Sequence, residues 1–388
     1  MRKIATFIVC LFAVLNAAEI ISVGEVSLTG GSSMYEGSSS QSGGNFNLAF
    51  VPAVKFNEKV SLLPGYYATY RGSKSVYELI GGGTLYQDMM SHNITLRLIN
   101  KISPRTKFKV RAGYLLNYFR ETKDEDWGEG LFDYSKLTGG IEVEKRLAFF
   151  EKFILSLDIF KVAFPEYASL ASEKYGREVY PGENILDFSG IMLYARILKR
   201  LGEKSILSMN ATFTMKDFPE QNIILKDASF SLDKRKDRTT YINTVFSKSL
   251  SSIFSLGISA SGIINRSNQN HYDAAEYKFV ERFYDYNSYS CGPVFSVGKK
   301  IRFDINYQYG IKNYKGRLAQ DKDGNYTDDK VKNTSNYASL TITYPVRKNL
   351  KLKISGNYYS QSSNQDYEAV YEYNYNTSSF EAGVVYEF

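Results

Sequence analysis

The sequence predicts an all-β fold, a transmembrane antiparallel up-and-down β-barrel of about 16 strands. Apolar and polar side chains alternate along one segment after another, which is the period of a strand with one apolar face. The connections between these segments are alternately short and long, as in barrels that cross a membrane. The composition combines 32 Tyr and 25 Phe with only 8 Pro, which suits strands and interfacial aromatic girdles.

The chain begins with the features of a secretory signal peptide. Two basic residues follow the initial Met and precede an apolar stretch, residues 4–15, that is too short to span a bilayer as a helix. Small residues suitable for cleavage come next. We therefore expect residues 1–18 to be a signal peptide and residues 19–388 to form a single transmembrane β-barrel domain.

The overall composition excludes several classes of protein. Cys10 lies in the apolar stretch of the expected signal peptide, so Cys291 would be the only cysteine of the exported chain. A lone cysteine forms neither an internal disulfide nor a cysteine-based zinc site, and we expect no metal and no cofactor. The net charge of +7 is a mild excess over 388 residues and does not indicate nucleic acid as a partner.

The individual strands follow from the alternation. About sixteen segments show it, each near the length that a tilted strand needs to cross a bilayer. Barrels of 14 or 18 strands are the alternatives. The clearest segment has apolar residues at every second position: Ile301, Phe303, Ile305, Tyr307, Tyr309 and Ile311. The expected strands span residues 20–31, 42–56, 59–72, 88–100, 104–119, 132–146, 150–163, 184–200, 203–217, 236–250, 251–266, 283–298, 299–315, 333–347, 349–360 and 373–388.

The expected long loops are rich in Asp, Asn, Gly, Ser and Lys. They include residues 164–183, 218–235 and 316–332. In the longest of them, residues 167–174 have a helix-forming composition. This loop could fold into the lumen and narrow it, or serve as a lid, or simply extend outward.

The last strand carries a further signature, because its apolar side chains alternate up to an aromatic residue at the very end. In this respect the sequence resembles Gram-negative outer-membrane β-barrels, whose last strand typically ends in Phe and is recognised by the barrel-insertion machinery. The resemblance covers the mature chain at the level of architecture and identifies no porin subfamily. It implies an insertion signal formed by Phe380, Val384, Tyr386 and Phe388.

The same resemblance implies a location and partners. The chain would be exported to the cell outer membrane, with a cleaved signal peptide and both termini in the periplasm. Its partners would be outer-membrane lipid and lipopolysaccharide, the barrel-insertion machinery and small hydrophilic solutes. A homo-oligomer is compatible with the sequence, although no stretch marks an oligomer face.

The polar faces of the expected strands would line a lumen, where basic side chains outnumber acidic ones. Charged rings bias ion flow, so we expect a porin-like channel for passive diffusion, with a weak preference for anions. Alternatively, these charges pair across strands and merely solvate the interior. The candidate lumen-lining residues are Arg97, Lys107, Lys109, Arg111, Arg196, Arg200, Arg302, Asp304, Lys351 and Lys353.

Two other functions fit the sequence. One is a non-conducting structural or surface-interaction barrel that uses its long external loops. The other is a substrate-specific transporter, in which Tyr67, Phe119 and Tyr359 on the lumen side would form an aromatic track. Continuity of the lumen distinguishes the first alternative from a channel.

Catalytic and metal sites have little support in the sequence. His92 is expected on the outer face and His271 in an external loop, and neither lies in an outer-membrane protease or phospholipase motif. We therefore expect no enzyme. Residues 321–329 cluster oxygen ligands around Gly324, but the spacing of a calcium-binding EF-hand is not met, so an ordinary turn is expected.

Overall fold

The computed structural model describes seven stretches of the chain. Residues 1–18, expected to be a signal peptide, lie outside them, and so does the greater part of the loop expected at residues 164–183. No helix in the described stretches has the length and apolar character needed to cross a membrane. The described residues are 19–35, 41–72, 88–120, 125–167, 184–274, 276–368 and 373–388.

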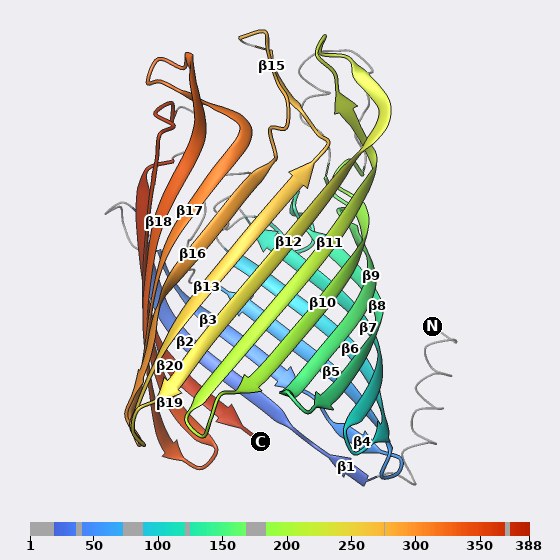
Figure 1. Cartoon of the computed structure of the whole chain (residues 1–388), viewed down its shortest axis with the longest axis vertical. Helices are drawn as coiled ribbons and strands as arrows, with labels where there is room; N and C mark the ends of the chain where they lie inside the picture. The colour runs from blue at the N-terminus through green and yellow to red at the C-terminus, as the bar shows by residue number, and fades with distance from the viewer. Residues whose placement is uncertain are drawn as a thin grey trace.

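Sixteen antiparallel strands form a closed barrel wall, which confirms the predicted fold class and strand number (Figure 1). The first wall strand, β2 (Gly24–Tyr35), pairs with the last, β20 (Tyr375–Glu387), and so closes the ring. Between them run β3 (Gln41–Phe50), β5 (Val60–Arg71), β6 (Asp88–Ser103), β7 (Thr106–Arg120), β8 (Tyr134–Leu147), β9 (Phe150–Ala163), β10 (Phe188–Arg200), β11 (Ser205–Ile224), β12 (Phe230–Ser249), β13 (Phe254–Ser267), β16 (Tyr286–Val297), β17 (Arg302–Gln320), β18 (Tyr326–Arg347) and β19 (Leu350–Ser363).

Four short strands complete the described structure. β4 (Ala53–Lys55) resumes the path of β3 after a break at Pro52, whose missing N–H interrupts the hydrogen-bond pattern. β1 (Glu19–Ile21) pairs with β4 at the edge of the wall. β14 (His271–Asp273) and β15 (Lys278–Val280) form a separate hairpin outside the wall.

The two faces of each wall strand meet different surroundings. On β9, Leu155, Leu157 and Ile159 are exposed on the outer face, with Ile159 62% exposed. Ser156 and Asp158 alternate with them and are buried on the inner face. An apolar surface of this kind is unfavourable in water but suits contact with lipid, so the outer face is the membrane-facing one.

Two of the expected loops are extensions of the wall. Residues 218–235 and 316–332 mostly continue the hairpins β11–β12 and β17–β18, which project beyond the other strands at the top of Figure 1. The strand register shifts after Asp217 and after Asn313, where the regular wall ends. Beyond that point only a few apolar residues are buried, among them Phe218, Ala319 and Val331. They do not follow the regular alternation of the wall, so the pattern that identifies a strand is lost.

The C-terminal strand closes the barrel at the end that carries the short turns, the short-turn end. Gly24 and Phe388 exchange backbone hydrogen bonds of 2.8 and 2.9 Å. A Cβ atom on Gly24 would collide with the Phe388 ring, which stacks on Phe50 and Tyr386 with centroids 6.4 and 6.1 Å apart. A larger residue at position 24 would therefore have to displace the Phe388 ring. A role as insertion signal stays a prediction for Phe380, Val384, Tyr386 and Phe388.

Candidate functional site in the lumen wall

The strand register determines which side chains face the lumen. Cross-strand partners point to the same side of a sheet, and successive residues alternate. Lys109 lies opposite Glu142, and Arg97 lies opposite Arg111, on the side away from the exposed apolar residues. The same reasoning places ten side chains on the inner face: Arg97, Lys107, Lys109, Arg111, Arg196, Arg200, Arg302, Asp304, Lys351 and Lys353.

Three of these residues join a network on β7, β8 and β9. The Lys109 ammonium lies 2.6 Å from both Glu142 Oε1 and Glu144 Oε2, and all three side chains are largely buried. Lys107 approaches Glu144 at 3.6 Å. We call this network the charge lattice; its members are Lys107, Lys109, Arg111, Glu142, Glu144 and Asp158.

Arg111 extends the charge lattice across a whole strand. Its guanidinium lies 2.8 Å from Glu142 on β8 and reaches Asp158 on β9 with two hydrogen bonds of 2.7 and 2.6 Å. Gly140 is the residue between Arg111 and Asp158 in the register, and a Cβ atom there would collide with the Asp158 carboxylate. The glycine thus makes this contact possible. Lys109, Arg111 and their carboxylates compensate one another within the lumen wall.

Four further candidates form more exposed ion pairs. Arg302 pairs with Asp304 at 2.8 Å, and Lys351 pairs with Glu387. Arg200 pairs with Glu151 at 3.0 Å. Exposed pairs contribute little to stability, about 0–1 kcal/mol each. Their main effect is to lower the net charge of the lumen surface.

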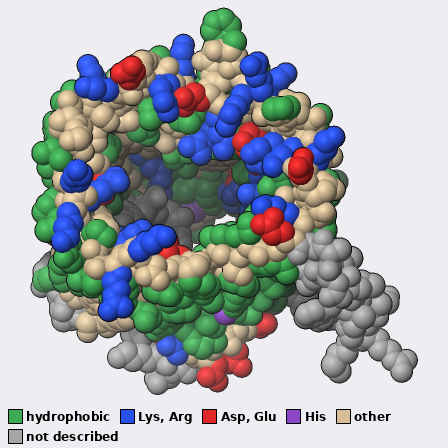
Figure 2. Space-filling view, turned by 90° about the horizontal axis from the view of Figure 1, so that it is seen from below, with side chains coloured by type: hydrophobic (Ala, Val, Ile, Leu, Met, Phe, Trp, Pro, Cys, Tyr) green, Lys and Arg blue, Asp and Glu red, His purple; other side chains and the backbone are tan. Residues whose placement is uncertain are grey.

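The other three candidates differ because they take part in none of the described ion pairs. Among the described residues, Arg97, Arg196 and Lys353 have no carboxylate partner within ion-pair distance. The Arg196 Nε is buried without a hydrogen-bond partner, and Arg97 is exposed in the lumen. Seen from the short-turn end, the barrel is hollow at its centre, and Lys and Arg side chains gather around the opening (Figure 2). Arg97, Arg196 and Lys353 therefore carry positive charge that no described carboxylate compensates directly.

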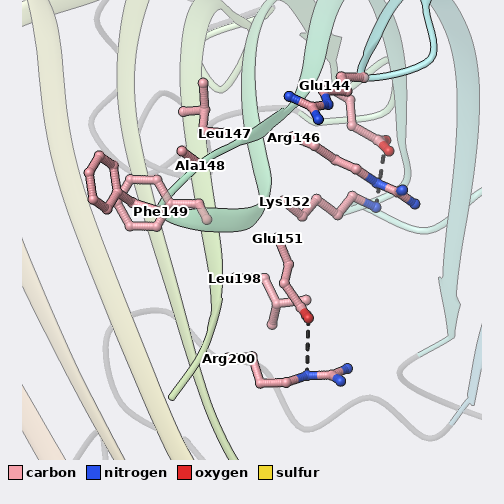
Figure 3. Close-up of a pocket in the computed structure, with 11 residues that line it drawn as sticks. Glu144, Arg146, Leu147, Ala148, Phe149, Glu151, Lys152, Leu198 and Arg200 are labelled. Atoms are coloured by element: carbon pink, nitrogen blue, oxygen red, sulfur yellow. Dashed lines mark ion pairs between the residues drawn. The ribbon is translucent and has the colours of Figure 1, made fainter. Parts of the chain in front are cut away.

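A pocket of about 890 Å³ lies at the short-turn end beside β8, β9 and β10 (Figure 3). Glu144 pairs there with Lys152 at 3.5 Å, and Glu151 with Arg200. Arg105 and Arg146 also line it, so its four cations face only two carboxylates. Arg105 and Lys152 were not among the predicted lumen-facing cations, because they lie at a turn and near the start of a strand, where the alternation is least informative.

The aromatic residues expected on the lumen side fall into separate groups. The ring centroid of Phe119 lies 6.2 Å from that of Tyr134, and the ring centroid of Tyr359 lies 5.8 Å from that of Tyr375. Tyr67 is exposed. The sequence did not indicate the cations that lie over rings, because the two members of each pair come from different segments whose relative position the sequence does not show. These pairs include Lys136 over Phe160, Lys216 over Phe188 and Arg317 over Phe283.

The two histidines lie away from the lumen wall. His92 is on the outer face, where its Nδ1 lies 2.9 Å from the Tyr66 hydroxyl. His271, in the β14–β15 hairpin, packs against Phe283 with centroids 4.5 Å apart, and burial lowers its pKa. In the part of the chain that the structure describes, no group of three metal-binding side chains occurs. Asp321 instead accepts hydrogen bonds from the Asp323 and Asn325 amides and so stabilises a turn.

Comparisons with known proteins agree with the barrel fold. No known family model and no curated protein matches the chain. Among solved structures, OccAB1 of Acinetobacter baumannii superposes with a TM-score of 0.51 at 11% identity, covering 95% of this chain and 97% of that one. OmpT, an outer membrane protein of Vibrio cholerae solved in a trimer form, gives 0.50 at 10% identity, covering 96% and 100%. The chain therefore has the fold of an outer-membrane β-barrel, and identities this low extend to the fold alone.

Proposed function

We propose that the chain is a porin-like channel of the outer membrane, exported with a cleaved signal peptide, through which small hydrophilic solutes diffuse passively. The observation that supports this proposal is the hollow lumen with a polar inner face and an apolar outer face (Figure 2). The outer face would contact lipid and lipopolysaccharide after the barrel-insertion machinery has acted on the last strand. A homo-oligomer is compatible with this arrangement.

The proposed channel has a weak preference for anions. The charge lattice is internally compensated, so it contributes little to the sign of the lumen potential. The preference would come from Arg97, Arg196 and Lys353 together with the surplus of cations at the short-turn pocket. Uncompensated charges in a pore attract the opposite sign, and salt screens their effect. We therefore expect a modest selectivity that is largest at low ionic strength.

The experiment that tests this function is electrical recording from the refolded mature protein in a planar bilayer. Discrete conductance steps are the expected result. A folded barrel that gives no steps would contradict the proposal.

A surface-interaction barrel is the second candidate, favoured by the external hairpins. β14–β15 is fixed to β17–β18 by a hydrogen bond of 2.7 Å from the Tyr326 hydroxyl to Asp273, and Lys278 lies 4.4 Å over the Tyr326 ring. The Gln269 side chain donates a hydrogen bond to the Asn222 carbonyl and accepts one from the Ile224 amide, both on β11. These contacts hold a projecting surface in one arrangement, which suits recognition. We propose no catalytic role for either candidate function.

A further inference from the structure

A second pocket lies in the lumen wall itself, on the part formed by β13 and β16 to β19. Its volume is about 150 Å³, comparable to a cavity of about 150 Å³ that takes one benzene molecule. It is separated from the charge lattice, which belongs to β7, β8 and β9. A ligand of the size of one six-membered ring therefore fits it.

The polar groups of this pocket are mostly neutral and already oriented. The Tyr359 hydroxyl donates a hydrogen bond of 3.0 Å to Gln361 Oε1, and Gln361 Nε2 donates one of 3.2 Å to the backbone of Tyr373. Asn333 Oδ1 accepts a hydrogen bond of 2.8 Å from Ser363. Hydroxyl and amide groups fixed in this way can exchange hydrogen bonds with a hydroxylated ligand at low entropic cost.

Aromatic rings form the apolar part of the pocket. Tyr286 and Tyr359 both line it, from β16 and β19. A small-molecule site typically combines apolar and aromatic walls with a few placed polar groups. A pyranose ring has this dual character, because its C–H face is apolar and its hydroxyls lie around the edge.

The lining of the pocket is neutral except for one residue. Its lining contains one cation, Lys312, and no carboxylate. The Lys312 ammonium lies 4.5 Å over the Tyr286 ring and 5.2 Å from the Tyr314 ring, so it already interacts with two aromatic faces. The remaining lining groups that can contact a ligand are neutral.

The inner wall around the pocket is also lined mainly by neutral polar groups. Its inward side chains on β13 to β19 are largely hydroxyls and amides, which offer a continuous series of weak hydrogen-bonding sites. Those in register next to the pocket include Ser261, Ser290, Asn306, Gln308, Ser339 and Asn357.

We propose that this pocket is a binding subsite for a neutral, polyhydroxylated six-membered ring, that is, a monosaccharide in its pyranose form. The solute reaches it through the lumen, and in this respect the inference rests on the proposed function. The cations without carboxylate partners and the cationic mouth then govern ions, whereas this hydroxyl-lined part of the wall binds uncharged sugars.

The test is equilibrium binding of glucose to the full refolded barrel in detergent, measured by saturation-transfer NMR, with glucuronate and cyclohexanol as comparison ligands. We expect saturable glucose binding in the millimolar range, and weaker binding of cyclohexanol because its single hydroxyl can use few of the amide and hydroxyl groups. Gln361→Leu removes oriented hydrogen bonds and should weaken glucose binding about tenfold.

A pair of matched variants locates the site. Ser335 lines the pocket, so Ser335→Trp should fill it and abolish glucose binding. Ser339 lies on the same face of β18 outside the lining, so Ser339→Trp should leave binding within about twofold. If Ser335→Trp does not fold, Tyr359→Leu replaces it, and loss of glucose binding is again the expected result.

Several results would overturn the subsite. These are a folded barrel without saturable glucose binding, equal losses in the two tryptophan variants, or glucuronate binding tenfold more tightly than glucose. Conductance is recorded separately. A silent barrel that binds glucose keeps the subsite and contradicts the channel, whereas a conducting barrel that does not bind glucose contradicts the subsite alone.

Discussion

Arg111 donates two hydrogen bonds, of 2.7 and 2.6 Å, to the carboxylate of Asp158 across the strand that lies between them. Asp158 is 2% exposed, and Gly140 on the intervening strand leaves room for the contact. The pair joins β7 to β9 over β8 on the inner face of the wall. The charge lattice therefore mainly stabilises the barrel wall and contributes little to ion selectivity.

Removing Arg111 should destabilise the barrel. Arg111→Met leaves the buried Asp158 carboxylate without its partner, and breaking one side of a buried ion pair costs about 3–5 kcal/mol. We expect a loss near the lower end of that range, because the lumen admits water. The measurement is urea-induced unfolding of the barrel in lipid vesicles. The double variant R111M/D158N should recover part of the loss.

The matched control for this prediction is the exposed pair on β17. Arg302 is 61% exposed in its side chain, so Arg302→Gln should change the stability by less than about 1 kcal/mol. Equal losses for Arg111→Met and Arg302→Gln would contradict the structural role of the charge lattice.

Gly140 should be sensitive to the smallest substitution. A methyl group there would collide with Asp158 and with the Leu157 carbonyl, so Gly140→Ala should cost about 1–3 kcal/mol of unfolding free energy. A methyl group on the neighbouring Gly139 would meet nothing within 4 Å, so Gly139→Ala should be neutral or slightly stabilising. The same urea titration compares the two, and a neutral Gly140→Ala would count against the contact.

Most strands of the barrel wall were predictable from the sequence, because contact with lipid requires one face of each strand to be apolar. Within the wall, one face must be apolar, so segments such as residues 150–163 and 349–360 were predicted to within a few residues of β9 and β19. Above the wall the rule ends, and residues 218–235 and 316–332 were expected as loops although they continue strands. Each extension pairs within its own hairpin without the regular apolar face, and some supporting contacts, such as those of Gln269 with β11, come from residues far away in sequence.

The anion preference should depend on the cations that lack carboxylate partners. Replacing Arg97 and Lys353 together by Gln should move the reversal potential in a KCl gradient toward zero. The shift should be larger at 0.1 M than at 1 M salt, because the screening length falls from about 10 Å to about 3 Å.

A control for this prediction changes the charge without changing the lumen. Lys161 is exposed on the outer face of β9, so Lys161→Gln should leave the reversal potential unaltered. An unchanged potential in R97Q/K353Q would assign the selectivity elsewhere, first to the pocket at the short-turn end.

Loss of the last aromatic ring should impair assembly. Phe388 packs over Gly24 and stacks on Phe50 and Tyr386 where β2 meets β20. Each aromatic pair contributes about 0.5–1.5 kcal/mol beyond the area that it buries. Phe388→Ala should therefore lower the yield of heat-modifiable, folded barrel on gel electrophoresis. Phe213→Ala, on the exposed outer face of β11, is the control and should assemble normally.

The external β14–β15 hairpin should loosen in acid. Burial holds the pKa of His271 below its usual 6.5 in the folded hairpin, with Asp273 opposing and Arg317 assisting the shift. As the pH falls below about 6.5, the open hairpin gains a proton that the closed hairpin does not, so the closed form loses stability.

Hydrogen exchange checks this prediction. Between pH 7 and pH 5, the protection of amides in residues 271–280 should fall after correction for the intrinsic exchange rate. His271→Asn should abolish the pH dependence. Protection that rises in acid would contradict the proposed burial of a neutral imidazole.

The candidate site was predictable only in part. Alternation indicated which charges share a face, but it could not show that Arg111 reaches past Gly140 to Asp158, because that contact depends on the register of three strands. The alternation also could not show that Arg97 and Lys353, unlike neighbouring cations, have no carboxylate partner. The lumen-wall pocket, which joins Tyr286, Lys312 and Tyr359, depends on strand neighbours that the sequence leaves unspecified.

The most direct test of the central claim is single-channel recording of the mature barrel in a planar bilayer under a KCl gradient. We expect discrete conductance steps and a small reversal potential of the sign given by chloride moving more easily than potassium. A silent barrel that is shown to be folded would contradict the channel, and a reversal potential of the opposite sign would contradict the role of the unpaired cations.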